Sequence, residues 1–332
     1  MTPPNIFRTM SSTPKRVLVG LAIFVAVAGI VLLGLRALLS QPGDQQNPYA
    51  YDISALKRAG RDAVQYAQTE RIGFATNEFH GIAVGADDRI YLAGERRMLV
   101  CDREGKHLSA TDLAAPARCI ALADNGDVYL GLEQHVEVLR GGTNRAVWSS
   151  LGSNALVTSL AVGPGSVYVA DAGNHVVWRC DFSGAVRQQI GRRNEAAGIP
   201  GFVIPSPYFD VAIGADNSLW VVNPGRHTLE NYSSDGSLRA TWGKAGTEIE
   251  SFCGCCNPSH IALMDDGSFV TSEKALVRVK LYAPTGEFRG VVAGPDLFAE
   301  GTAGLDLAVD ASGRILVLDP QAGMVRVFTK KP

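Results

Sequence analysis

Hydrophobic and polar positions alternate in six similar segments that occupy most of the chain after residue 62. Each segment has a short aliphatic strand, a turn of Asp, Asn or Gly, and a second alternating strand, which is the pattern of a β-hairpin. The hairpins start at Gly81, Cys119, Ser159, Asp210, His260 and Asp306. One aligned position in the first strand holds alanine in all six: Ala83, Ala121, Ala161, Ala212, Ala262 and Ala308. A repeated β unit therefore makes up most of the chain.

Two more strands follow the hairpin in each unit. The third ends in Cys or Tyr four residues before a Gly, at Cys101, Cys180, Tyr232 and Tyr282. Successive units start 38 to 51 residues apart, as from Gly81 to Cys119 and from Ser159 to Asp210. Four antiparallel strands at this period predict an all-β fold, a six-bladed β-propeller over residues 62–330. The recurrent alanine fits a first strand that lies at the crowded axis.

The last unit is one strand short. Residues 305–328 contain three strands, whereas residues 62–73, DAVQYAQTERIG, alternate like a strand ahead of the first unit. We expect this early segment to complete the sixth blade, because pairing the two ends removes the exposed edges of an open ring.

An uncharged apolar stretch, VLVGLAIFVAVAGIVLLGL, occupies residues 17–35. As a helix it would extend about 28 Å, close to the ~30 Å hydrocarbon core of a bilayer. Arg8, Lys15 and Arg16 precede it and Arg36 follows, so the positive-inside rule places the N-terminus in the cytoplasm. A cleaved secretory signal or a buried helix is the alternative, but a signal's apolar region is shorter and ends in a small-residue site.

These features divide the chain into a cytoplasmic tail at 1–16, a transmembrane anchor at 17–39, a linker at 40–61 and the propeller at 62–330. We expect a single-pass membrane protein with its propeller in the periplasm or another extracytoplasmic compartment.

With a net charge of −2 across 332 residues, nucleic acid is not an expected partner. The 36 glycines and 46% hydrophobic residues suit a turn-rich folded domain and exclude a disordered chain or a coiled coil.

Residues 167–186, VYVADAGNHVVWRCDFSGAV, resemble an NHL repeat in their Ala-Asp pair, the following Asn, the Val-rich strand and the Gly turn. The resemblance extends over about 62–330, although the other units keep the strand pattern and lose the Ala-Asp-Asn detail. It implies a six-bladed propeller, a fold that NHL proteins use as binding scaffolds, as a lyase and as sugar-acid hydrolases. The histidine ligands of the related amidating lyase are matched here only by His260 and His80, and Gly81 stands where related lactonases have a metal-binding Glu.

A cluster of soft ligands lies just before the fifth unit, in SFCGCCNPSHIAL. Cys253, Cys255, Cys256 and His260 could bind a transition metal or an iron–sulfur cluster. Their spacing differs from the common zinc and ferredoxin motifs, and the alternatives are a disulfide in an oxidising compartment or free thiols. Cys101 and Cys180 are expected to be small buried side chains.

The first residues of the inner strands form a second candidate site. In a propeller they ring the mouth of the central channel, which places Cys119, Asp210, His260 and Asp306 there, with His80 beside them. Such a ring could bind a metal ion or a polar ligand. Alternatively, its Asp and Ser side chains satisfy backbone N–H groups where the strands begin.

The sequence thus favours a membrane-anchored binding or scaffold subunit, for which we expect a protein partner or a membrane complex. One alternative is a metal- or redox-cofactor-binding propeller that uses the cysteines. The other is a divalent-ion-dependent hydrolase or lyase at the channel mouth, although the metal-binding residues of the NHL lyase and lactonases are largely unmatched here.

Overall fold

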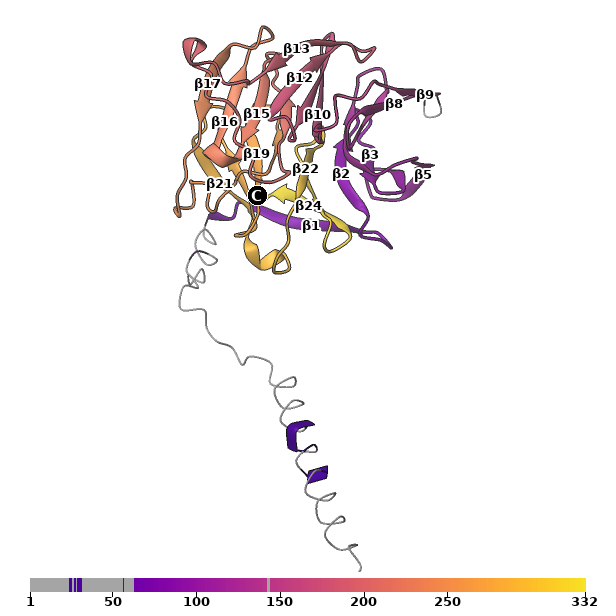
Figure 1. Ribbon diagram of the computed structural model, residues 1–332, viewed down its shortest axis with the longest axis vertical. Helices are drawn as coiled ribbons and strands as arrows, with labels where there is room; N and C mark the ends of the chain where they lie inside the picture. Colours follow the sequence, from indigo (N-terminus) through magenta and orange to yellow (C-terminus); the bar gives the residue numbers. More distant parts are fainter. Residues whose placement is uncertain (1–23, 26, 28, 32–55, 57–62, 142–143) are drawn as a thin grey trace, which may run out of the picture. The chain divides into compact units, whose positions relative to one another are not determined.

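The computed structural model describes residues 24–25, 27, 29–31, 56, 63–141 and 144–332. The described residues from 63 onward form six four-stranded antiparallel sheets arranged around an axis as the blades of a propeller (Figure 1). The all-β, six-bladed architecture predicted from the repeats is therefore confirmed.

The apolar stretch near the N-terminus belongs to a separate unit, residues 1–52. Its described residues, 24–25, 27 and 29–31, are helical. Among the described residues, no helix combines the length and the apolar character needed to cross a membrane. The predicted tail, most of the predicted anchor at 17–39 and nearly all of the linker at 40–61 lie outside the described residues.

The first three blades follow the chain in order. Blade 1 contains β2 (Phe79–Val84), β3 (Ile90–Gly94), β4 (Arg97–Cys101) and β5 (His107–Asp112). Blade 2 contains β6 (Ala117–Leu122), β7 (Val128–Leu132), β8 (Val136–Arg140) and β9 (Asn144–Val147). Blade 3 contains β10 (Val157–Gly163), β11 (Ser166–Asp171), β12 (Val176–Cys180) and β13 (Val186–Ile190).

The remaining blades have longer connections, which include short 3₁₀ turns. Blade 4 contains β14 (Val211–Ile213), β15 (Leu219–Asn223), β16 (Thr228–Tyr232) and β17 (Leu238–Trp242). Blade 5 contains β18 (His260–Leu263), β19 (Phe269–Glu273), β20 (Arg278–Tyr282) and β21 (Phe288–Ala293). Blade 6 contains β22 (Asp306–Val309), β23 (Ile315–Asp319), β24 (Met324–Lys330) and β1 (Tyr66–Gly73). The short 3₁₀ turns are Glu195–Ala197, Pro224–Arg226 and Pro295–Leu297.

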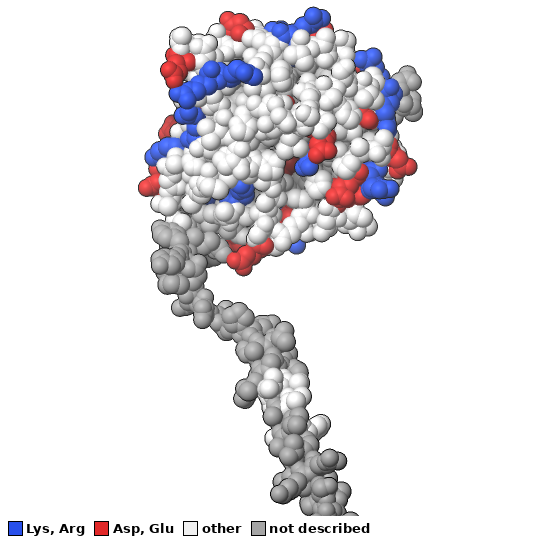
Figure 2. Space-filling view, viewed as in Figure 1, with Lys and Arg blue, Asp and Glu red and all other residues white. Residues whose placement is uncertain are grey.

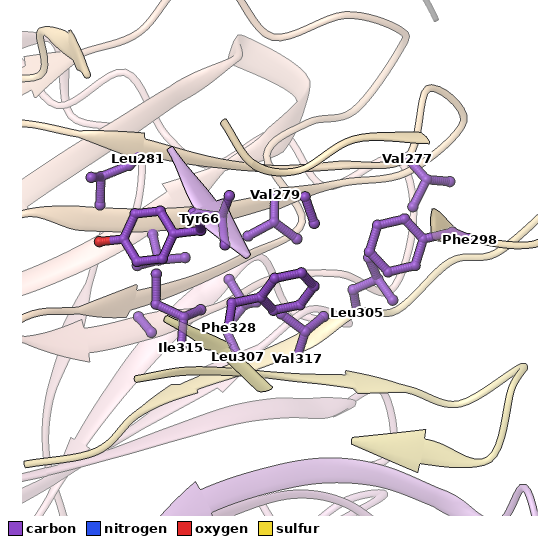
Figure 3. Close-up of a cluster of buried hydrophobic side chains, with 14 residues drawn as sticks. Tyr66, Val277, Val279, Leu281, Phe298, Leu305, Leu307, Ile315, Val317 and Phe328 are labelled. Atoms are coloured by element: carbon purple, nitrogen blue, oxygen red, sulfur yellow. The ribbon is translucent and has the colours of Figure 1, made fainter. Parts of the chain in front are cut away.

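The ring is closed by β1, which pairs with β24 from Tyr66 opposite Lys330 to Gly73 opposite Met324. The sequence predicted this closure. Tyr66 lies in one apolar cluster with Leu281 of blade 5 and Phe328 of blade 6 (Figure 3). The N-terminal strand therefore contributes to the core between the last two blades as well as to the sheet.

The first strand of each blade faces the axis and contacts the first strands of its two neighbours. The six aligned alanines lie in these inner strands: Ala83, Ala121, Ala161, Ala212, Ala262 and Ala308. Small side chains suit this position because the inner strands converge on the axis. We call the end of the ring where the inner strands begin the entry face.

The turn after the third strand requires glycine. Gly184 and Gly286 adopt φ values of +88° and +84°, in the left-handed region. A Cβ at Gly184 would also lie 2.4 Å from the Trp148 ring, and one at Gly286 would lie 2.6 Å from Trp242. The Gly spacing noted in the sequence therefore reflects both backbone conformation and close packing between blades.

A buried polar side chain at the end of the second strand holds the connection that enters the blade. The Asp171 carboxylate accepts hydrogen bonds from the backbone N–H of Leu156 and from the side chains of Asn174 and Trp178. This network gives a structural reason for the Asp and Asn of the NHL-like segment. Glu273 accepts the backbone N–H of Cys253 in the same way in blade 5.

Charged side chains on the face seen in Figure 2 lie mostly around its edge, where Lys and Arg alternate with Asp and Glu. Uncharged residues make up most of the middle of that face.

Candidate functional site at the entry face

Side chains at the start of the inner strands join neighbouring blades. The Asp210 carboxylate accepts the backbone N–H of Ile261 in the next blade at 2.7 Å, and Asp306 accepts that of Ile82 at 2.8 Å. Each carboxylate also accepts the N–H of the residue that follows it. The expectation that these aspartates satisfy backbone groups is therefore confirmed, and the bonds fix both carboxylates at the axis.

His260 lies between these two carboxylates. Its Nδ1 atom is 3.7 Å from Asp210 Oδ2 and 3.4 Å from Asp306 Oδ1. The His260 side chain is only 12% exposed. One ligand atom from each of the three residues lies within 4.8 Å of the others. We call Asp210, His260 and Asp306 the entry triad.

The electrostatics of the entry triad favour bound positive charge. The pKa of Asp306 is raised to about 6, chiefly by burial and also by the charge of nearby Asp210, while His260 opposes the rise. Burial alone would lower the pKa of His260, but the nearby Asp210 and Asp306 carboxylates outweigh burial, so the pKa is raised. His260 and Asp306 therefore bind a proton more tightly than the same groups would in water.

A cavity of about 180 Å³ opens beside the triad and is lined by His260, Tyr208, His80 and Arg118, among others. The Tyr208 ring packs edge-on against His260, with 5.8 Å between ring centres. His80 is partly exposed, with Nε2 3.8 Å from Glu95 Oε1. The cavity thus combines an exposed guanidinium, two imidazoles and a phenol, which suits a small polar or anionic ligand.

Cys119 does not join the triad, although it occupies the same position in its strand. A β-bulge between Ala117 and Cys119 shifts the register of β6 against β7. The Cys119 thiol is buried against Gly131, where an added Cβ would meet it at 2.2 Å. Because bulges redirect side chains, this cysteine belongs to the core between blades 2 and 3.

The four predicted soft ligands are not gathered into one set. Among the described residues, the entry triad is the cluster in which at least three His, Cys, Asp or Glu side chains bring their ligand atoms together. This cluster includes His260 but none of the three cysteines. Cys253 is half-buried, Cys255 is exposed and Cys256 is buried in the loop before β18. All six cysteines are free thiols in this structure, and Cys101 and Cys180 are buried as expected.

Several residues around the triad were not singled out from the sequence. Tyr208 and Arg118 line the cavity, and Lys274 lies over the Tyr208 ring at 5.3 Å. Each lies just before the first aligned position of an inner strand: Tyr208 two residues before Asp210 and Arg118 one residue before Cys119. His80 lies one residue before Gly81 in the same way. That shared position is the signal that could have identified them.

A larger cavity of about 740 Å³ lies at the opposite ends of the inner strands, among blades 2 to 4. Its lining includes Asp124, Asp127, Arg140 and Phe182 but no member of the entry triad. Size alone is a weak guide to function here, because the buried ligand groups converge at the smaller cavity.

No family model matches the chain, and no curated protein matches its sequence. The NHL resemblance therefore stays a prediction. Solved structures do match, although their low identities show a shared fold and nothing more.

A streptogramin B lyase structure aligns with a TM-score of 0.56 and 9% identity, covering 80% of this chain and 98% of that one. Virginiamycin B lyase from Staphylococcus aureus aligns with a TM-score of 0.55 and 11% identity, covering 80% and 100%. A protein of unknown function from Bacteroides thetaiotaomicron aligns with a TM-score of 0.61 and 13% identity, covering 80% and 76%.

Proposed function

We propose that this chain is a ligand-binding propeller that holds a divalent metal ion between Asp210, His260 and Asp306. The observation that carries the proposal is the convergence of two carboxylate oxygens and an imidazole nitrogen within 4.8 Å at the channel mouth. Oxygen and nitrogen donors of this kind suit Mn²⁺ or Zn²⁺. The backbone hydrogen bonds to both carboxylates would hold the donors in place before the ion arrives.

The ion would contribute charge for recognising a ligand in the adjacent cavity. Three protein donors leave coordination positions open, and the cavity beside His260 offers the guanidinium of Arg118 and the hydroxyl of Tyr208. A small anionic or polar molecule matches these groups. Cation-dependent hydrolysis or elimination is a second candidate function, favoured by the same open positions.

Calorimetric titration of the full chain with Mn²⁺ tests the proposal. We expect one ion per chain, and at least about tenfold weaker binding in Asp306→Asn and in His260→Gln, since each removes a charge or a donor from the set. Asp266→Asn is the matched control, because Asp266 is an exposed carboxylate of blade 5. Equal Mn²⁺ affinity in the wild type and in both triad variants would contradict the proposal.

We further propose that residues 17–39 anchor the chain in a membrane, with the propeller outside the cytoplasm beside a partner protein or membrane complex. The uncharged stretch and the preceding Arg8, Lys15 and Arg16 support this orientation. Alkaline phosphatase fused after Pro332 is expected to be active in the full chain and inactive when residues 1–60 are removed. Activity of a cytoplasm-only reporter at the same site would contradict the orientation. A mature chain whose N-terminus lies between residues 37 and 45, as found by N-terminal sequencing, would show a cleaved signal instead of an anchor.

A further inference from the structure

Two adjacent thiols form a compact pair in the loop before β18. The Sγ atoms of Cys255 and Cys256 are 3.0 Å apart, about 1 Å farther than the length of an S–S bond. Cys255 is exposed, whereas Cys256 is 1% exposed. One sulfur can therefore meet a solute while the other stays beneath it.

The loop that carries the pair is firmly held. The buried Asn257 side chain donates hydrogen bonds to the carbonyls of Cys253 and Lys274, and its carbonyl accepts the backbone N–H of Lys274. Glu273 accepts the N–H of Cys253 from the other side. These bonds fix the thiol pair next to Lys274.

The surroundings of Cys256 favour its thiolate. Lys274 Nζ donates a hydrogen bond to Ser206 Oγ at 2.9 Å, and Ser206 Oγ lies 3.5 Å from Cys256 Sγ. Burial raises the pKa of Cys256, but the hydrogen bond with Cys255, the nearby Lys274 cation and the hydrogen bond from Ser206 outweigh burial and lower the pKa. The pKa of Cys255 is raised, mainly by its hydrogen bond to Cys256.

We propose that Cys255 and Cys256 form a redox-active dithiol that reduces a low-molecular-weight disulfide and is itself oxidised to a Cys255–Cys256 disulfide. Neither cysteine belongs to the entry triad, and the inference does not depend on the metal proposal. The geometry of the pair provides an accessible attacking sulfur, a neighbouring acceptor for the proton and a second sulfur already in position.

The exchange proceeds in two displacements. The Cys255 thiol first passes its proton to Cys256 Sγ. The Cys255 thiolate then attacks one sulfur of the solute disulfide and breaks its S–S bond, so a mixed disulfide forms and the first solute thiolate leaves and takes up a proton from water. Cys256 then loses its proton to water and attacks Cys255 Sγ. The Cys255–Cys256 bond forms, and the second solute thiolate leaves and is protonated. Two cysteine sulfurs lose one electron each, and the two solute sulfurs gain them.

The third thiol of the loop is a matched control. Cys253 is half-buried, and its backbone is bound to Glu273. Among the described residues, its thiol makes no hydrogen bond to either member of the pair. We therefore expect Cys253→Ser to leave the exchange unchanged.

The test is incubation of the reduced full chain with glutathione disulfide, followed by mass spectrometry without reductant. We expect the wild type and Cys253→Ser to lose two hydrogens per chain, to release two equivalents of glutathione and to contain a Cys255–Cys256 bond. Cys256→Ser should react more slowly, because the acceptor for the Cys255 proton is lost, and should stop with one glutathionyl group on Cys255, because the second displacement has no nucleophile. Lys274→Met should slow alkylation of the pair at pH 7 about tenfold, since it removes the cation nearest the thiolate.

Three results would overturn the inference. One is a stable glutathionyl adduct on wild-type Cys255, and another is oxidation of Cys253 at the same rate as the pair. The third is an alkylation rate for the pair that Lys274→Met leaves unchanged.

Discussion

Deletion of residues 1–75 is expected to abolish cooperative unfolding of the propeller, whereas deletion of residues 1–60 should preserve it. The longer deletion removes β1 and exposes the edge of β24, whose Val325, Val327 and Phe328 are fully buried in the intact ring. It also removes the buried side chains Tyr66 and Ile72, and an exposed sheet edge promotes aggregation.

The expected loss of stability can be sized from the two buried side chains and the strand pairing that the longer deletion removes. Removing a large core side chain costs about 2–5 kcal/mol, and a whole domain is stable by only about 5–15 kcal/mol. Loss of Tyr66 and Ile72, together with the pairing of β1, is therefore comparable with the total stability.

Circular dichroism with urea titration measures the outcome. Because the longer deletion is expected to aggregate through its exposed sheet edge, the full-length variant with Tyr66→Ala and Ile72→Ala provides the quantitative comparison. We expect it to lower the unfolding free energy by about 4–10 kcal/mol. Equal urea midpoints for the two deletions, or for the double variant and the wild type, would contradict closure by β1.

Replacement of Glu273 by Gln should destabilise the protein by about 3–5 kcal/mol. Its carboxylate is fully buried and accepts a hydrogen bond from Arg278 Nε at 2.6 Å, with Lys280 Nζ 3.3 Å away. Burial lowers the pKa of Lys280 to about 8, an effect that Glu273 opposes. Without the carboxylate, two buried basic groups lose their counter-charge.

The same substitution should loosen the cysteine-bearing loop. Lys280 Nζ donates hydrogen bonds to the carbonyls of Ile249 and Ser251, and Glu273 holds the N–H of Cys253. The measurement is the urea midpoint together with amide exchange over residues 249–256. Asp266→Asn is the control, because its pair with Arg289 is exposed and should contribute less than about 1 kcal/mol. A Glu273→Gln urea midpoint equal to that of Asp266→Asn would show that the buried ion pairs of Glu273 with Arg278 and Lys280 do not stabilise blade 5.

The fold was largely predictable because its signals are local. Alternating strands, the turn glycines and the inner-strand alanines each reflect a constraint within one unit, and the strand-like residues 62–73 completed a count of four strands per blade. Bulges were not visible in these patterns, so the sequence placed Cys119 at the channel mouth although its thiol faces Gly131.

The site was only partly predictable, because side-chain direction depends on neighbouring blades. The position shared by Asp210, His260 and Asp306 followed from the repeat alignment. Sequence proximity instead grouped His260 with Cys253, Cys255 and Cys256, whereas the adjacent blades bring the two carboxylates to its Nδ1 atom. The roles of Ser206 and Lys274 beside Cys256 required contacts between loops 68 residues apart in sequence.

Binding of a divalent ion by the entry triad is tested most directly by crystals grown with Mn²⁺ and measured near the manganese absorption edge. We expect an anomalous-difference peak between Asp210 Oδ2, His260 Nδ1 and Asp306 Oδ1, and loss of that peak in His260→Gln crystals under the same conditions. Wild-type crystals that contain Mn²⁺ in the solvent but show no peak between these three atoms would contradict it.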